Sequence, residues 1–271
     1  IMNTTTPRQP TFYLPHGGGP CFFMENTRGP ADMWAPMAAF LRGLVETLPE
    51  KPKAVVIVSG HWEERDFAVN TAPNPALLFD YYGFPEHTYH LKYPAPGSPD
   101  LARRVRALLD GAGLATSEDA ERGLDHGVFV PFMLVLPDAD VPIVEISLRA
   151  DLDPAAHLRA GAALSALRDE GVMIVGTGMS FHNMRMFGPG AAAPSKRFDA
   201  WLSEVVTAPN VDARNNALIG WEGAPAGRTS HPREEHLLPL MVAAGAAGAD
   251  RGTKVFEGQV LGATVSAFRF G

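Results

Sequence analysis

Short apolar runs alternate with amphipathic segments along most of the chain. Two runs near the C-terminus, Lys254–Leu261 and Ala263–Phe270, predict a pair of antiparallel strands. The alternation predicts a single α/β domain over residues 1–271, with a mainly parallel central sheet flanked by helices. Four earlier runs are continuously apolar, as in strands buried on both faces: Phe12–Leu14, Lys53–Ser59, Pro142–Ser147 and Val172–Gly176.

The segments between these runs mostly carry apolar residues at helical spacing. A helix is expected from Met33 to Leu48, just before a proline that would end it. A second helix is expected to begin at a cap formed by Ser98 or Asp100. Further helices are expected over Asp153–Asp169, over Ser195–Val206, and from Ser230, as the N-cap, through Ala244.

Three segments are expected to be other than helical. Phe67–Thr71 predicts a strand, and Asn210–Gly227, around Trp221, predicts a loop. Ala72–Pro99 is rich in proline and aromatic residues, and a long loop inside a compact domain usually serves a site. This segment is expected either to line or cover a binding site or to pack on the sheet as a satellite cluster.

Three of the apolar runs lead into turns that contain a histidine: His16, His61 and His182. Parallel strands bring their carboxyl ends to a common edge of the sheet, so these histidines are expected to converge there. His126 and His236 also occupy turn contexts. Imidazole is a ligand for Zn, Cu, Fe and Ni, and no cysteine cluster is present to favour a softer metal. The pattern predicts a mononuclear metal site at the C-terminal strand edge, with or without a carboxylate ligand.

Other chemistries are less well supported by the same residues. No G-x-S-x-G motif is present, which argues against a serine hydrolase. Gly17-Gly18-Gly19 could cradle a phosphate, but no lysine–serine pair follows it. Cys21, close to His16, is either a nucleophile or, as is more common, a small buried residue.

Composition narrows the expected partners and location. The net charge of −7, without a basic cluster, argues against nucleic-acid binding. No apolar stretch approaches the roughly 18 residues of a membrane span, and Ile1–Pro10 is too polar for a signal-peptide core. A single cysteine excludes an intramolecular disulfide and fits a reducing compartment. We therefore expect a cytoplasmic protein with no membrane partner.

Six short motifs occur along the chain in this order: H-G-G-G-P at His16–Pro20, S-G-H-W at Ser59–Trp62, Y-G-F-P-x-x-x-Y at Tyr82–Tyr89, L-D-H-G at Leu124–Gly127, G-x-S-x-H-N at Gly178–Asn183 and H-P-x-x-E-H-x-x-P at His231–Pro239. Together they resemble those of the class III (LigB-type) extradiol ring-cleavage dioxygenases, in the branch of the 4,5-DOPA extradiol dioxygenases. The glycines after His16 differ from the H-G-S-P form of many members, which leaves substrate detail open.

The resemblance implies a divalent metal: Fe(II) for ring-cleaving activity, with Zn(II) also associated with this branch. It implies that His16 and His61 are metal ligands. His236 is the implied third ligand, and Glu235 is its rival, because class III relatives use two histidines and a glutamate. His182 is implied to act as acid and base, and to ligate the metal when no substrate is bound.

Two further histidines receive roles from the same resemblance. His126 is the implied catalytic group that hydrogen-bonds substrate or oxygen, and His231 is implied to orient the loop before the last helix. The implied reaction opens a catechol-type ring, DOPA-like or related, with O2 to give a semialdehyde. Two alternatives stay open: a zinc-dependent hydrolase that uses the same histidines to hold an activated water, and a non-catalytic binding protein that retains the fold.

Overall fold

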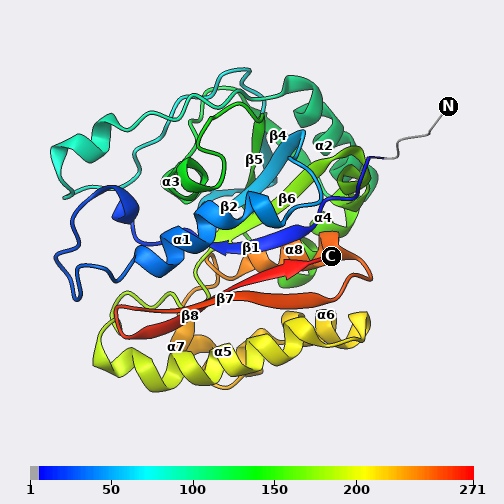
Figure 1. Ribbon diagram of the computed structural model, residues 1–271. Helices are drawn as coiled ribbons and strands as arrows, with labels where there is room; N and C mark the ends of the chain where they lie inside the picture. Colours follow the sequence, from blue (N-terminus) through cyan, green and yellow to red (C-terminus); the bar gives the residue numbers. More distant parts are fainter. Residues whose placement is uncertain (1–5) are drawn as a thin grey trace.

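The apolar runs pair into one eight-stranded sheet, in the order β4-β3-β5-β2-β6-β1-β8-β7 (Figure 1). A computed structural model describes residues 6–271, so residues 1–5, at the polar start of the chain, lie outside the described part. The strands are β1 (Thr11–Pro15), β2 (Ala54–Glu64), β3 (Phe67–Asn70), β4 (Thr116–Asp119), β5 (Ile143–Arg149), β6 (Val172–Gly178), β7 (Gly252–Val260) and β8 (Ala263–Phe270).

The centre of the sheet is parallel and its ends are partly antiparallel. Strands β5, β2, β6 and β1 are successive parallel neighbours, with β2 between β5 and β6. The predicted C-terminal pair is confirmed: β7 and β8 are antiparallel, and β8 also pairs antiparallel with β1. The expected α/β domain with a mainly parallel sheet is therefore confirmed, and the carboxyl ends of β1, β2 and β6 lie at one edge.

Helices cover both faces of this sheet. Helices α1 and α3 pack on one face, while α2, α4 and α8 pack on the other, where α5 covers β7 and β8. The helices are α1 (Ala35–Gly43), α2 (Pro99–Gly111), α3 (His126–Val135), α4 (Pro154–Leu164), α5 (Ala192–Thr207), α6 (Val211–Ile219), α7 (Gly227–Ser230) and α8 (Leu238–Ala247).

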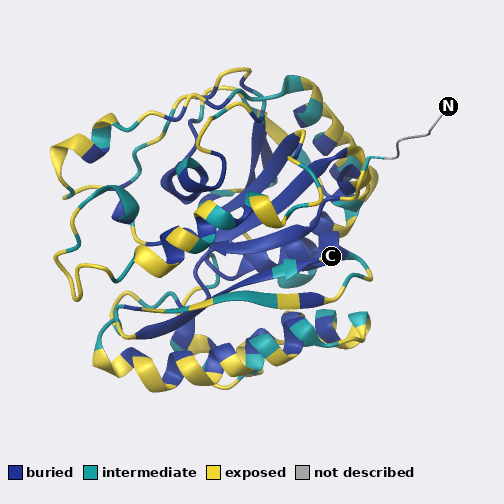
Figure 2. Cartoon of the chain, in the orientation of Figure 1, coloured by how far each residue is buried: buried dark blue, intermediate teal, exposed yellow. Residues whose placement is uncertain are grey.

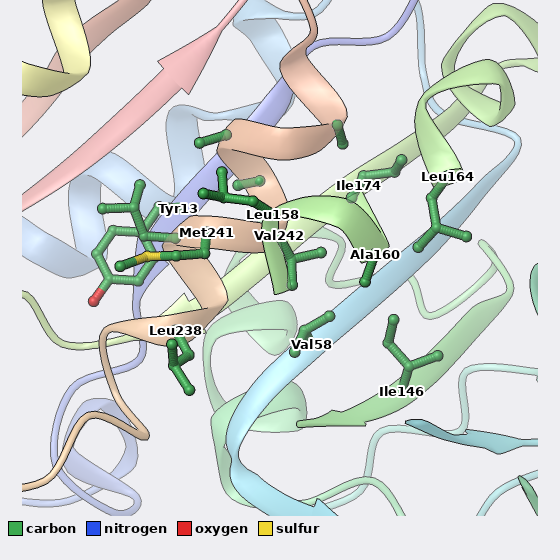
Figure 3. Close-up of a cluster of buried hydrophobic side chains, with 14 of the residues drawn as sticks. Tyr13, Val58, Ile146, Leu158, Ala160, Leu164, Ile174, Leu238, Met241 and Val242 are labelled. Carbon is green, nitrogen blue, oxygen red and sulfur yellow. The ribbon is translucent and has the colours of Figure 1, made fainter. Parts of the chain in front are cut away.

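Successive residues of β2 contribute in turn to the two hydrophobic cores, one on each face of the sheet. Val56 and Val58 belong to the cluster under α4 and α8, whereas Val55 and Ile57 belong to the cluster under α1 and α3, because successive strand residues point to opposite faces. Figure 3 shows Val58 of β2 together with Leu158 of α4 and Val242 of α8 in the first cluster. The central strands are buried along most of their length (Figure 2).

The helix starts follow local capping chemistry. Ser98 is the N-cap of α2, since its side chain accepts a hydrogen bond from the Leu101 amide, and this decides between the two caps expected there. Asp125 caps α3 in the same way, accepting from the Gly127 amide. Among residues 6–271, no helix combines the length and apolar character that a membrane crossing requires.

Two predictions near the C-terminus are wrong. The expected loop Asn210–Gly227 contains α6, which begins at an N-cap on Asn210. The expected helix from Ser230 does not form as predicted: Ser230 ends α7, and α8 begins only at Leu238. Pro239 explains this boundary, because proline is tolerated in the first turn of a helix and disrupts its interior.

One strand is longer than predicted, and another has no counterpart among the predicted strands. β2 continues past Ser59 to Glu64, with a register shift against β5 between Val58 and Glu63. His61 is therefore inside a strand end that the irregularity bends, rather than in a turn after it. Thr116–Asp119 forms β4, a polar edge strand beside β3 that carries no apolar signal.

A buried histidine away from the strand edge predicts acid sensitivity. His157 of α4 donates from Nδ1 to the Asp153 carbonyl (2.7 Å) and accepts the Arg149 amide at Nε2 (3.1 Å). Burial lowers the pKa of His157 from 6.5 to about 4. Between these values the unfolded chain binds a proton that the folded chain does not, so stability falls as the pH drops from 6.5 to 4.

This histidine contributes at most roughly 3 kcal/mol to that loss. We expect urea midpoints measured from pH 7 to pH 4.5 to fall, and to fall less steeply in His157→Gln, which no longer titrates. An identical pH slope in the variant would show that His157 is not the group responsible.

Candidate metal centre

Three histidine rings converge at the carboxyl edge of the sheet. His16 directly follows β1, His61 lies in the last part of β2, and His236 lies in the turn before α8. His61 Nε2 is 3.2 Å from His16 Nε2 and 3.2 Å from His236 Nε2. Sequence elements more than 200 residues apart therefore present the same ring atom to one point. Of the three histidines that the strand-edge pattern predicts to converge, His16 and His61 belong to this group, and His236 joins them from the loop before α8.

The loop that carries His236 lies against the sheet edge because two glycines leave room for it. A Cβ atom on Gly178 would lie 2.1 Å from the His236 carbonyl oxygen, and one on Gly60 would lie 2.8 Å from the Glu235 carbonyl oxygen. The Tyr13 hydroxyl donates to the same His236 carbonyl (2.6 Å). The glycines of the S-G-H-W and G-x-S-x-H-N motifs thus permit the approach that brings His236 to its partners.

Glu235 sits behind His236, on the side away from the converging nitrogens. His236 Nδ1 is 3.2 Å from Glu235 Oε1, where it donates to the carboxylate. The proton held at Nδ1 leaves Nε2 as the unprotonated, ligating nitrogen, a second-shell arrangement that is usual for metal-bound histidine. This geometry favours His236 over Glu235 as the third candidate ligand.

The electrostatic environment keeps the three rings neutral. Burial, followed by the neighbouring histidines, lowers the pKa of His16 and of His236 well below 6.5. Burial also lowers the pKa of His61 to about 4. Neutral imidazole is the form that binds a metal ion.

The donor set fits a divalent cation. One ligand atom from each of His16, His61 and His236 lies within 4.8 Å of the others, a grouping able to hold a metal ion. The His16 Nδ1 atom is buried with no hydrogen-bond partner among the described residues. A single proton shared among the three Nε2 atoms cannot give each of them a hydrogen bond, whereas a metal cation can accept the lone pairs of all three.

His182 lies at the side of this group rather than within it. Its ring stacks on that of His236, with centroids 3.4 Å apart and planes 12° from parallel. His182 Nδ1 is 3.5 Å from Glu235 Oε1, and these two residues form a separate candidate group with His236. The structure therefore brings His182 beside one predicted ligand, and not into the group formed with His16 and His61.

His126 is adjacent to the cluster and is held by a residue that the sequence did not reveal. Its ring centroid is 4.0 Å from that of His61. Asp80 Oδ1 accepts from both the Nδ1 (2.7 Å) and the backbone amide (3.0 Å) of His126. Asp80 thereby sets the ring orientation and leaves Nε2 free to accept a proton; no motif or spacing pairs these two residues in advance.

A buried network of charged side chains contacts the His61 backbone. Arg122 donates to the His61 carbonyl (3.2 Å), to Asp125 (3.2 Å) and to Glu145 (3.3 Å). Burial and the Asp125 charge raise the pKa of Glu145 well above its usual range. Burial opposes ionisation of Asp125 as well, but the Glu145 hydrogen bond and the charge on Arg122 contribute to holding its pKa at about 2. Glu145 is thus the protonated partner of the pair, and Ser59 adds a 2.8 Å hydrogen bond to Asp125.

His231 is fully buried and donates from Nε2 to the Ser180 carbonyl (2.9 Å), which ties the loop before α8 to the segment after β6.

Cys21 is also buried, and its sulfur accepts from the Gly18 amide. Burial raises the pKa of the Cys21 thiol to about 12, so it is a packing residue rather than a nucleophile.

A large cavity of about 1150 Å³ opens directly onto the histidines, with His16, His61, His126 and His182 in its wall. Part of the aromatic segment Ala72–Pro99 lines it, through Tyr81–Pro85 and His87. The same segment also packs inward, where Phe79 and Tyr81 contact Phe129 of α3. The segment therefore lines the cavity, as expected, and also packs inward on α3, and Tyr81 takes part in both.

Similarity to known proteins extends over nearly the whole chain. The family model described as "Catalytic LigB subunit of aromatic ring-opening dioxygenase" matches residues 10–268. The chain belongs to the LigB family. It is 38% identical to "4,5-DOPA dioxygenase extradiol" of Beta vulgaris, over 88% of this chain and 87% of that protein. It is 36% identical to "Dioxygenase tasH" of Hapsidospora irregularis, over 97% of this chain and 85% of that protein.

The fold of this LigB chain is also found in a solved structure. An uncharacterized protein from Escherichia coli K12 superposes with a TM-score of 0.78 at 30% identity, covering 97% of this chain and all of that one. The motif resemblance to LigB-type enzymes of the 4,5-DOPA extradiol branch is thereby confirmed, and the chain is an extradiol dioxygenase by family.

Proposed function

We propose that this LigB chain is a non-haem, metal-dependent extradiol dioxygenase that opens a catechol-type ring with O2 to give a semialdehyde. The observation that carries the proposal is the convergence of the His16, His61 and His236 Nε2 atoms beside the large cavity, whose wall includes His16 and His61. The substrate partners are thus a small catechol and O2, and residues 1–271 act as one catalytic domain in the cytoplasm.

His16, His61 and His236 would hold the metal, with His182 as an additional ligand in the absence of substrate. We propose Fe(II) as the working metal, and Zn(II) as an ion that the same imidazoles also bind. Fe(II) bound there would lower the pKa of the catechol hydroxyls and mediate electron flow from the ring to O2.

The chain's own residues move the protons. His126 Nε2 is the proposed acceptor of a catechol proton, because its Nδ1 proton is already donated to Asp80. His182, which lies beside the Glu235 carboxylate, is the second proposed acid and base. The mostly apolar cavity wall would hold the ring next to these two imidazoles.

Metal reconstitution separates this proposal from its alternatives. Metal-free protein is loaded anaerobically with Fe(II) or with Zn(II) and given DOPA, caffeate, protocatechuate and an activated ester. We expect the Fe(II) form alone to consume O2 and produce a yellow semialdehyde. Ester hydrolysis by the Zn(II) form, with no catechol turnover by either form, would instead indicate a hydrolase; metal and catechol binding without turnover would indicate a binding protein.

A further inference from the structure

The hairpin turn between β7 and β8 places a leucine in an unfavourable backbone conformation at the cavity wall. Leu261 has φ +49° and is followed by Gly262 with φ +80°. Two-residue hairpin turns with positive φ at both positions strongly favour Asn-Gly. A leucine there is strained, and such strain often marks a side chain retained for function. The Leu261 side chain lines the cavity that contains the histidines.

The rest of the cavity wall beyond the histidines is mostly apolar. Its large apolar members come from separate parts of the fold: Trp34, Tyr81, Phe84, Met179 and Phe187. Among the described residues, the only Asp, Glu, Lys or Arg side chains that line this cavity are Glu25 and Arg28, both exposed. An ionic group near the catechol ring would therefore lose water without gaining a buried partner of opposite charge.

Two loops at the same end of the molecule hold this wall together. His87 Nε2 donates to the Phe23 carbonyl (2.8 Å), joining the segment 81–87 to the segment 17–28. The Phe84 ring lies against Gly19, where a Cβ atom would come within 2.7 Å of it. Both loops lie on the left in Figure 1, at the end where the β7–β8 turn also lies. The cavity is thus a built feature of the fold.

The size of the cavity exceeds what a single small catechol requires. Its volume of about 1150 Å³ is above the roughly 300–1,000 Å³ typical of sites for drug-sized ligands. We infer, on the basis of the function proposed above, that the preferred substrate is a catechol bearing a bulky apolar substituent, such as a second ring, which packs against Leu261 and the aromatic wall. A short zwitterionic or carboxylate side chain, as in DOPA, fits this wall poorly.

Binding to the Zn(II)-loaded protein without O2 tests this inference independently of turnover. The ligands are caffeate, methyl caffeate and phenethyl caffeate, which share one catechol ring and differ in charge and then in apolar bulk. We expect phenethyl caffeate to bind at least ~10-fold more tightly than methyl caffeate, since a buried ring contributes in proportion to its area. Equal affinities for the two esters, or tighter binding of caffeate, would overturn the inference.

The matched variants are Leu261→Asn in the wall and Ile219→Asn on α6, whose side chain is exposed and outside the cavity lining. Asparagine suits the turn conformation, so Leu261→Asn is expected to keep or raise the thermal midpoint. It should weaken phenethyl caffeate by about threefold or more and change methyl caffeate by less, whereas Ile219→Asn changes neither. An unchanged phenethyl caffeate affinity in Leu261→Asn would remove Leu261 from the subsite.

Turnover of 4-methylcatechol by the Fe(II) form is measured in parallel. If it is absent while the ester preference holds, the proposed function fails and the ligand class stands. If it is present without an ester preference, the proposed function stands and the inference about the substituent fails.

Discussion

Replacing His61 with alanine is expected to abolish metal binding and ring cleavage together. His61 Nε2 is the atom that approaches both other candidate ligands, so its loss leaves two nitrogens that no longer share a neighbour. Loss of a second-shell partner alone costs about 10–100-fold in metal affinity, so loss of this ligand should cost more than about 100-fold. Metal content after dialysis, measured by atomic emission, checks this expectation.

Two further variants sharpen the metal result. His90→Ala removes an exposed histidine whose Nε2 pairs with Glu86, and should leave metal content and activity intact. Glu235→Gln should weaken metal binding by about 10–100-fold without abolishing it, because Glu235 contacts the Nδ1 atoms of His236 and His182 and leaves the Nε2 atom of His236 in place. Full metal occupancy in His61→Ala would show that the ligand assignment is wrong.

Replacing His126 with alanine should separate metal binding from turnover. The His126 ring lies next to His61, but its Nδ1 is committed to Asp80, and it is not part of the group formed by His16, His61 and His236. We expect His126→Ala to keep its metal and to lose about 10²–10⁴-fold in kcat, the usual contribution of a positioned acid or base. Steady-state kinetics on metal-replete protein provide the measurement.

Asp80→Asn is the companion to that variant. The amide oxygen can still accept from His126 Nδ1 but carries no charge, so a smaller loss of kcat is expected than in His126→Ala. Loss of metal from His126→Ala would instead make His126 a ligand, and an unchanged kcat would remove it from the proposed proton transfer.

The strand pattern predicted the part of the fold that positions the histidines. Buried parallel strands read directly as apolar runs, which is why the positions of β1, β2 and β6 followed from residues such as Ile57 and Val175. Edge strand β4 is polar and gives no apolar signal in the sequence, because it forms by backbone pairing with β3 rather than by burial of its side chains. The residues at Ser230 resemble a helix start, but α8 begins only at Leu238, where Pro239 lies in the first turn.

The side-chain partners of the site were less accessible to sequence reasoning. Convergence of His16 and His61 is expected because parallel strands share a carboxyl edge, whereas the Asp80–His126 contact joins a long irregular loop to a helix start. Likewise, the Arg122–Glu145 contact depends on β5 lying next to β2, and a single sequence contains no signal for that adjacency. The strain at Leu261 is visible only as a backbone angle.

Oxygen stoichiometry tests the central claim most directly. Fe(II)-loaded protein is given a limiting amount of 4-methylcatechol in an oxygen-electrode cell, while catechol loss, ring-opened product and H2O2 are quantified. Ring cleavage by a dioxygenase predicts that one O2 disappears per catechol lost, with an equal yield of semialdehyde and no H2O2. Catechol loss accompanied by quinone and H2O2, or no O2 consumption at all, would contradict it.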